Sequence, residues 1–296
     1  MKFQLNYKLT VSATTGVKLS DTANHPFAAV IVTPPLTLQF DVKRSTAATC
    51  NNATFTITNL GEETRNRIYQ DQFDVTAYKF VILEVGYGDD LSMVFSGQIR
   101  HAHSSRRGTE WITTIDAWDN FGAINGTTNK TLPAGVDFST IFNQVSSDMP
   151  ELNDPIISGA LTSRIVSRRG VSLMGNSWLI AKRWKPVDHQ LFIDNNTMHL
   201  MHWDEYVSVG IPVISSGMGL LETPRRDTAL IHVKLLLEPR LIMAQAIALE
   251  SADPRYNSQY KIVGIHHSGT ISETVGGGCT TELDLFLGTG LLRSIV

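Results

Sequence analysis

Cysteine is scarce in this chain, since Cys50 and Cys279 are the only two among 296 residues and lie far apart. Without a Cys-x-x-Cys spacing, neither a zinc nor an iron–sulfur site is indicated, so we expect reduced thiols and no cofactor. Long apolar runs are missing too. No stretch approaches about eighteen consecutive apolar residues, and the first residues lack the apolar core of a signal peptide. We therefore expect a soluble product made in a cytoplasm.

An excess of positive charge is also missing, because 25 Lys and Arg face 28 Asp and Glu and the formal net charge is -3. A general binder of nucleic acid or of anionic membranes usually carries a strongly basic surface. The charge balance therefore argues against both of these classes of protein.

Common catalytic motifs are absent as well: the sequence has no G-x-S-x-G elbow, P-loop, G-x-G-x-x-G or HExxH pattern. Its adjacent acid pairs, such as Asp89 with Asp90, lie in turn-like settings typical of solvated loops. His266 and His267 fall in a predicted strand, where neighbouring side chains face opposite sides and cannot share one ion. We expect no metal site, no enzyme activity and no small-molecule substrate.

What the sequence does contain is a series of short segments with the two-residue period of half-buried strands, from Leu36 to Trp118. A short helical turn over residues 59–68 interrupts the series, with Glu63 and Arg67 spaced to pair at i,i+4. A polar, basic loop is expected between the last two strands. The expected strands cover residues 37–42, 53–58, 81–87, 93–99 and 111–118.

The first 35 residues contain one alternating segment, from Phe3 to Val11, which predicts either an ordinary first strand of the same module or an arm that reaches a neighbour. Pro34 and Pro35 then mark a joint, because proline cannot donate a hydrogen bond to a sheet.

Residues 119 to about 186 change period. Asp137 is placed to cap a helix that continues through Val145. The spacing of apolar residues over 167–184 predicts a second helix, although two glycines weaken it. Residues 189–201 predict a hairpin with an Asn-rich turn. Strands return after about residue 207, with clean alternation over 231–235 and a last strand over 279–287.

Several short motifs follow one another in a fixed order: F-x-V-x-R-S from Phe40, A-T-F-T-I-T-N-L from Ala53, T-R-N-R-I from Thr64, V-G-Y-G-D from Val85, V-F-S-G-Q-I from Val94 and I-D-A-W-D-N from Ile115. This order resembles the first barrel of phage baseplate hub proteins, the gp27-like group of contractile-tailed phages. A later progression, L-L-x-P-R-L from Leu236 and Y-K-I-V-x-I-x-H-x-G from Tyr260, is similar to the second barrel of such proteins.

The resemblance implies a mainly β (α+β) fold in which two tail-tube-like β-barrel modules flank a small mixed helical and hairpin insert. The corresponding segments are residues 1–120, with the arm and the first barrel, 121–206, with the insert, and 207–296, with the second barrel. It also implies a homotrimer, because two similar barrels per chain would form a pseudo-six-fold ring.

In that interpretation the chain is a structural subunit in the virion tail baseplate, assembled in the host cytoplasm, which adapts the hexameric tail tube to a separate central spike. The implied partners are the tail tube protein, the spike protein, the tape measure protein and other baseplate proteins, with genomic DNA passing only in transit. Two alternatives remain open: a distal tail or tube-completion ring protein, and a cell-wall-degrading hub enzyme.

Two basic groups are candidate interface residues, with ordinary solvated surfaces as the alternative. The first lies in the expected loop after residue 99 and comprises Arg100, His101, His103, Arg106 and Arg107. The second flanks the apolar residues of the insert and comprises Arg168, Arg169, Lys182 and Arg183. A conduit should not hold DNA tightly, because each neutralised phosphate adds affinity. We therefore expect a neutral or acidic channel wall.

Overall fold

In the computed structural model, the described residues form a mainly β protein, as expected, with three α-helices. The structure describes residues 4–12, 29–47, 49–71, 73, 78–207, 210–273, 277–288 and 292–295. Phe3, where the alternating segment of the sequence begins, lies outside the described residues. Within them, no helix is long and apolar enough to cross a membrane.

The first part of the chain forms strands that pair in the order β3-β4-β7-β6-β5-β1-β2. These elements are β1 (Leu5–Ser12), β2 (Val30–Val32), β3 (Leu38–Ser45), β4 (Asn52–Thr58), α1 (Glu62–Ile68), β5 (Phe80–Tyr87), β6 (Asp90–Arg107) and β7 (Glu110–Trp118). Strand β1 pairs with both β5 and β2, which confirms the prediction of an ordinary first strand. The Pro34–Pro35 joint, which contains a cis peptide bond, follows β2.

The middle part packs two helices against two small sheets. Its elements are β8 (Thr127–Leu132), α2 (Phe138–Ser147), β9 (Ile156–Ile157), β10 (Val171–Asn176), α3 (Ser177–Trp184), β11 (His189–Asp194) and β12 (Thr197–His202). The capped helix and the hairpin are confirmed, since the Asp137 side chain accepts a hydrogen bond from the Thr140 amide at 2.7 Å and β11 pairs with β12.

The predicted helix over 167–184 is wrong in its first half. Residues Val171–Asn176 form β10 and pair with β8, and only then does α3 begin. Gly175 has a φ of +123°, which lies outside helical geometry. Asn176 supplies the cap, because its side chain accepts a hydrogen bond from the Leu179 amide at 2.9 Å.

The last part returns to strands, as expected. Its elements are β13 (Glu205–Tyr206), β14 (Val213–Ser215), β15 (Arg225–Asp227), β16 (Leu230–Leu236), β17 (Ala246–Glu250), β18 (Ser258–Ile271), β19 (Thr280–Phe286) and β20 (Arg293–Ser294). Four single-turn 3-10 helices complete the described elements: η2 (Ala123–Asn125), η3 (Gly159–Leu161), η4 (Ser216–Met218) and η5 (Pro254–Tyr256).

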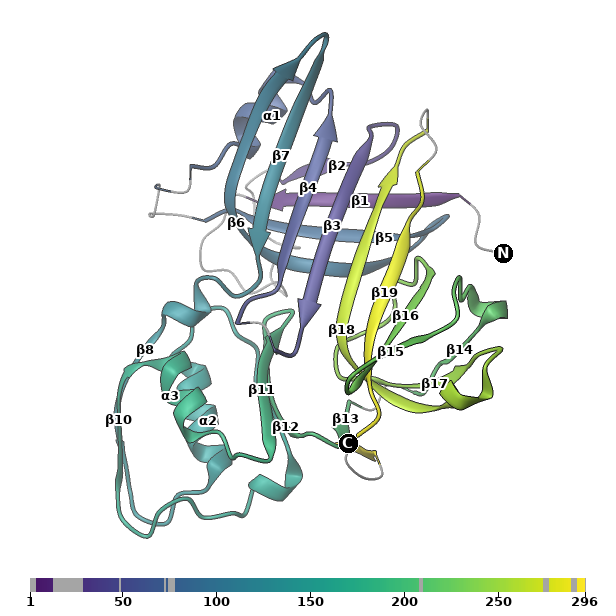
Figure 1. Ribbon diagram of the computed structural model, residues 1–296. Coiled ribbons are helices and arrows are strands. Elements are labelled where there is room, and N and C mark those ends of the chain that lie inside the picture. The colour runs from purple at the N-terminus through teal and green to yellow at the C-terminus, as the bar shows by residue number, and fades with distance from the viewer. Residues whose placement is uncertain are drawn as a thin grey trace.

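The two β regions are not separate closed barrels. Strand β18 pairs with β3, from Gly264 opposite Ser45 to Ile271 opposite Leu38, and so joins both regions into one 13-stranded sheet. Among the described strands the main path of this sheet has two ends, β15 and β2, so it does not close. The prediction of two barrels is corrected to one open, strongly curved sheet, in which β1 and β5 cross behind β3 and β4 (Figure 1).

Three buried apolar clusters stabilise this arrangement. The first lies between β1, β5 and the strands β3, β4 and β7, and includes Leu9, Phe40 and Phe55. The second fills the middle part around Phe142, and the third lies behind β16, β18 and β19. Leu237, Ile271 and Cys279 of the last part belong to the first cluster, so the two β regions share buried surface. The division at residues 120 and 206 stays a prediction.

Candidate functional site

The face of the sheet that points away from the first and third clusters is polar. It is formed by alternate residues of six adjacent strands, β16, β19, β18, β3, β4 and β7, whose partners alternate into the core. We call this surface the polar sheet face. Its members include His232, Lys234, Glu282, Asp284, His266, Ser268, Asp41, Lys43, Asn52, Thr54, Thr56, Thr114 and Asp116.

Strand register shows that the polar sheet face continues across the junction of the two β regions. One cross-strand row runs Lys234, Glu282, His266, Lys43 and Asn52. Neighbours in such a row have Cβ atoms about 5 Å apart, close enough for their side chains to interact. The row crosses five strands without a break, so the surface belongs to the whole sheet rather than to either half.

Acidic and basic side chains of the polar sheet face pair with one another, both along this row and with residues beside it. Lys234 lies 2.9 Å from Glu282, and His266 lies 2.8 Å from Asp41 and 3.5 Å from Glu282. His232 pairs with Asp284 at 2.6 Å. Each of these polar side chains remains partly exposed; Lys43, for example, is 58% exposed and pairs with Asp41 at 3.3 Å.

The pairs also set the protonation of the carboxylates. The hydrogen bond from Lys234 lowers the pKa of Glu282, and the charges of Lys234 and His266 add to the effect against partial burial. Partial burial acts to raise the pKa of Asp41, but the hydrogen bonds and charges of His266 and Lys43 outweigh it and lower that pKa. Both groups therefore stay ionised near neutral pH.

The balance of fixed charge on the polar sheet face is close to zero. Four carboxylates, Asp41, Asp116, Glu282 and Asp284, face two ammonium groups, Lys43 and Lys234, and the guanidinium of Arg100 at one margin. Thr54 donates a hydrogen bond to Asp116 at 2.9 Å, so this carboxylate is engaged as well. The surface can interact with water and with passing polar groups, but it offers few cations to a polyanion.

The first predicted basic group lies in a strand and not in a loop, because β6 continues to Arg107 and turns only at Gly108. A bulge between Ile99 and His101 leaves Ile99 buried and His101 half-buried. Arg100 is exposed, and its guanidinium carbon lies 4.5 Å from the centroid of the Trp118 ring. His101 and His103 stack with ring centroids 4.8 Å apart, beside Asp116 and Thr114. They extend the polar sheet face onto β6.

Arg106 and Arg107 lie at the tip of the β6–β7 hairpin, away from the two histidines, and both are exposed. Arg106 donates to the Gly108 carbonyl at 3.1 Å. The expected compact cluster is therefore divided between a sheet face and a hairpin tip. Among the described residues, no group of three or more His, Cys, Asp or Glu side chains could hold a metal ion.

The second predicted group is also divided. Arg168 and Arg169 lie in the exposed loop before β10, and Arg183 is exposed near the end of α3. Lys182 turns toward the sheet, where its Nζ lies 3.3 Å from Thr49 Oγ1 and 5.0 Å from the Trp178 ring centroid. The tryptophans in and after α3 differ in exposure: Trp178 is buried, Trp184 is half-buried and Trp203 is 41% exposed.

A buried polar network joins the sheet to the middle part. Arg44 on β3 donates to both carboxylate oxygens of Asp194 on β11, at 2.8 and 2.5 Å. Asn51 donates to Asp119 at 2.6 and 2.7 Å through its backbone amide and its side chain, and to Asp194 at 3.2 Å. One guanidinium thus faces two buried carboxylates.

This imbalance changes the protonation of the network. Burial, followed by the charge of Asp194, raises the pKa of Asp119 to about 8. The neighbouring His199, stacked on Phe192, is kept neutral because burial lowers its pKa to about 4. His267 is fully buried and its pKa falls to about 3, while His266 lies on the polar sheet face, as the strand period predicts.

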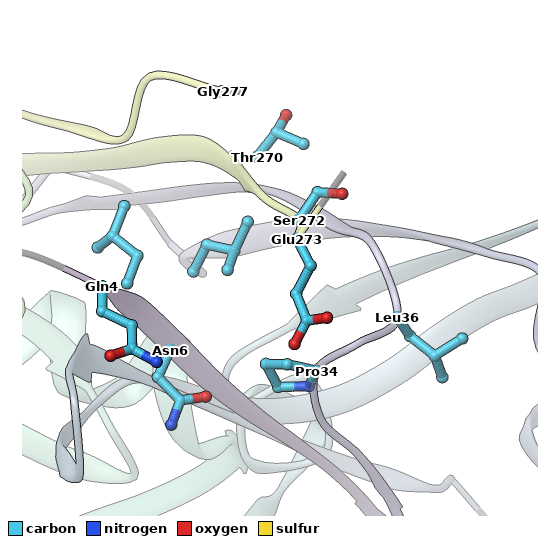
Figure 2. Close-up of a pocket in the computed structure, with 10 residues that line it drawn as sticks. Gln4, Asn6, Pro34, Leu36, Thr270, Ser272, Glu273 and Gly277 are labelled. Carbon is cyan, nitrogen blue, oxygen red and sulfur yellow. The ribbon is translucent and has the colours of Figure 1, made fainter. Parts of the chain in front are cut away.

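A separate recess of about 420 Å³ lies between the start of β1, the Pro34 joint and the end of β18. Figure 2 shows Glu273 extending toward Pro34 across this recess, with Gln4 and Asn6 on the opposite side. Among the residues that the structure describes, its lining has one carboxylate and no cation, and these residues form no recognisable catalytic arrangement.

Sequence reasoning missed the paired charges of the polar sheet face and the Arg44–Asp194 pair. A signal for the first was present, because His232 and Lys234, and Glu282 and Asp284, occupy alternate positions of predicted strands. No local signal exists for the second, since its partners are 150 residues apart.

The fold of this chain is similar to the folds of several solved tail proteins. The Neisseria meningitidis MC58 tail protein matches with a TM-score of 0.61 and 9% identity, covering 97% of this chain and 98% of its own. The 43 kDa tail protein of prophage MuSo2 from Shewanella oneidensis matches with a TM-score of 0.60 and 7% identity, covering 94% and 96%.

An Escherichia coli protein, c3393, described as a type VI secretion component with structural similarity to T4 tail proteins gp27 and gp5, matches with a TM-score of 0.56 and 10% identity, covering 88% of this chain and 78% of its own. No curated protein sequence matches this chain. The model of the family "Baseplate hub gp41" matches residues 15–270. The chain belongs to this baseplate hub family and is a component of the phage tail, which confirms the hub resemblance.

Proposed function

We propose that this protein forms a trimeric ring in the tail baseplate, with the polar sheet face of each chain as the wall of the genome-ejection channel. The observation that carries the proposal is the unbroken cross-strand row from Lys234 to Asn52. Because one surface spans both β regions, each chain would occupy two of six similar positions around an axis. Three chains would then match a hexameric tail tube to a three-fold spike.

The charge pattern suits a conduit. A polyanion is retained by fixed cations that displace its counterions, and retention rises with every phosphate neutralised. On the polar sheet face Lys43 and Lys234 are each paired with a carboxylate, so they offer little net attraction. DNA would pass along a hydrated wall that neither holds nor strongly repels it.

The same proposal assigns the partners. The ring would contact the tail tube protein on one side and the central spike on the other, with the tape measure protein and the genome passing through and other baseplate proteins outside. The structural similarity of Escherichia coli c3393 to the T4 tail proteins gp27 and gp5 supports a hub and spike pairing. The role is structural, and we assign no enzyme activity or cofactor.

Native mass spectrometry of the purified protein, with two-dimensional class averages from electron microscopy, tests the ring. A trimer with a pseudo-six-fold outline is expected. A true hexamer would instead favour a distal tail or tube-completion protein, and a monomer that partners do not assemble would contradict the proposal. Muralytic activity lost on changing a single carboxylate would favour the cell-wall-degrading alternative.

A further inference from the structure

The middle part carries a shallow recess of about 570 Å³ between the start of α2 and the end of α3. The half-buried side chains of Phe138, Val166 and Trp184 form its apolar floor, and Pro186 and the exposed Val187 also line it. Val187 is 94% exposed, and the two aromatic residues are only half-buried. Apolar side chains that gather in a recess rimmed by polar groups commonly mark a contact with another protein.

The rim of this recess is basic. Arg164, Arg183 and Lys185 line it, and Asp188 is the one carboxylate among the lining residues. Among the described residues, neither Arg164 nor Arg183 has an ion-pair partner. Asp188 already pairs with His189 at 2.9 Å, and this hydrogen bond lowers its pKa. The recess therefore carries uncompensated positive charge.

The positions of the cations favour an extended peptide over a nucleic acid. The Arg164 guanidinium lies over the Phe138 ring, 5.5 Å from its centroid, and so occupies a ring face on which a base would stack. Val166 and Val187 are aliphatic and give no stacking surface. The Lys185 ammonium donates two hydrogen bonds, to the carbonyls of Pro186 and His189 at 3.2 and 2.7 Å, and its third N–H can donate to a ligand.

We propose that this recess binds an acidic segment of another protein, with one apolar side chain on the floor and flanking carboxylates on Arg164 and Arg183. Charge complementarity identifies the occupant. The apolar floor fits one apolar side chain, and the guanidinium groups at the rim fit Glu or Asp residues on either side of it. The inference goes beyond the channel role and does not depend on ring formation, since the recess belongs to one chain.

The test uses the full-length protein and a dye-labelled peptide with three glutamates on either side of one phenylalanine, followed by fluorescence anisotropy at low and high salt. Binding is expected at low salt and should weaken as salt rises. A matched peptide with glycine in place of phenylalanine should bind at least about threefold more weakly, because it lacks the apolar contact.

Variants locate the binding to the recess. Arg164→Gln with Arg183→Gln should weaken binding about tenfold, and Val187→Ser about threefold. Arg225→Gln, which removes an exposed cation on β15, should have no effect and is the matched control. Val187 is so exposed that its replacement cannot disturb folding, and circular dichroism checks the double variant.

Four outcomes would overturn the proposal: no binding of the phenylalanine peptide at low salt, equal binding of the glycine peptide, equal loss in the Arg225 control, or unchanged binding by the double variant. A single-stranded DNA oligonucleotide of the same charge serves as competitor. Displacement of the peptide by this DNA at lower concentration than by unlabelled peptide would assign the recess to nucleic acid and also overturn the proposal.

Discussion

The polar sheet face and the recess between α2 and α3 both carry basic side chains, but the lysines of the sheet face have carboxylate partners and, among the residues that the structure describes, the two arginines of the recess do not. On the sheet, Lys43 and Lys234 have carboxylates within 3.3 and 2.9 Å. At the recess, Arg164 and Arg183 lie beside exposed apolar residues and, within the described chain, without such partners. A surface whose cations are paired with carboxylates suits the passage of DNA, whereas a surface with unpaired cations suits the binding of another protein.

The sheet and the middle part of the chain meet at the buried network of Arg44, Asn51, Asp119 and Asp194. Arg44 comes from the same strand as Lys43, but it points into the protein and contacts the hairpin of the middle part. Neighbouring residues of one strand therefore serve the exposed face and the junction.

The largest effect is expected at the junction. Arg44→Met leaves Asp194 as an uncompensated buried carboxylate and should lower the free energy of unfolding by about 3–5 kcal/mol. Urea denaturation of the purified variant measures this loss. Lys43→Met, on the exposed side of the same strand, is the control and should cost less than about 1 kcal/mol. Equal costs would contradict the assigned network.

The junction should also make stability depend on pH. The pKa of Asp119 is raised to about 8 in the folded protein, so the folded state holds this proton more tightly than the unfolded chain does. The stabilisation from this group is complete below its unfolded pKa of about 4 and is lost as pH rises toward 8.

Between pH 6.5 and 8, Asp119 lowers the free energy of unfolding as pH rises, whereas His199, His267 and Lys261, whose pKa values burial lowers, act in the opposite direction. The Asp119 contribution alone should fall by about 1–2 kcal/mol over this window. Asp119→Asn removes this contribution and leaves the other groups in place, so the wild-type protein should lose about 1–2 kcal/mol relative to the variant as pH rises, measured by denaturation of both proteins at several pH values. A difference between the two proteins that stays constant with pH would contradict the role of Asp119.

A smaller effect is expected where α2 begins beside the recess. Asp137→Ala removes the side-chain cap on the Thr140 amide and should cost about 1 kcal/mol. The same change should weaken peptide binding, since Phe138 belongs to the first turn. Asn143→Ala, an exposed change on the same helix away from the cap, provides the comparison in thermal denaturation. If Asn143→Ala cost as much, the cap would not be the cause.

The smallest effect belongs to the polar sheet face. Glu282→Gln removes the partner of Lys234 and of His266, but these side chains are partly exposed, so the loss should stay below about 1 kcal/mol. DNA should instead be retained more strongly in the assembled ring, because Lys234 becomes unpaired. A filter-binding assay at low salt measures this change, and weaker retention would be inconsistent with a channel wall.

Local patterns in the sequence predicted most of the strands, the Asp137 cap and the hairpin at Asn195, because each depends on neighbouring residues. Strand period also placed His266 and His267 on opposite faces. The misplaced helix over 167–184 shows the limit, since Val171, Met174 and Trp178 fit a helical period although β8 recruits the first part into a sheet.

The continuous sheet could not be predicted in this way. Pairing of β3 with β18 joins residues more than 200 positions apart, and the alternation of each strand is the same whether it closes its own barrel or joins another region. The two basic groups likewise looked compact in sequence, but the β6 bulge and the turn of α3 direct their members to different surfaces.

An electron cryomicroscopy map of the assembled baseplate would show directly what the polar sheet face contacts. In the proposed ring, Asp41, Thr54 and Glu282 of three chains face an open, solvent-filled channel around one axis. A map in which this face is buried against another protein, or lies on the outside of the ring, would contradict it.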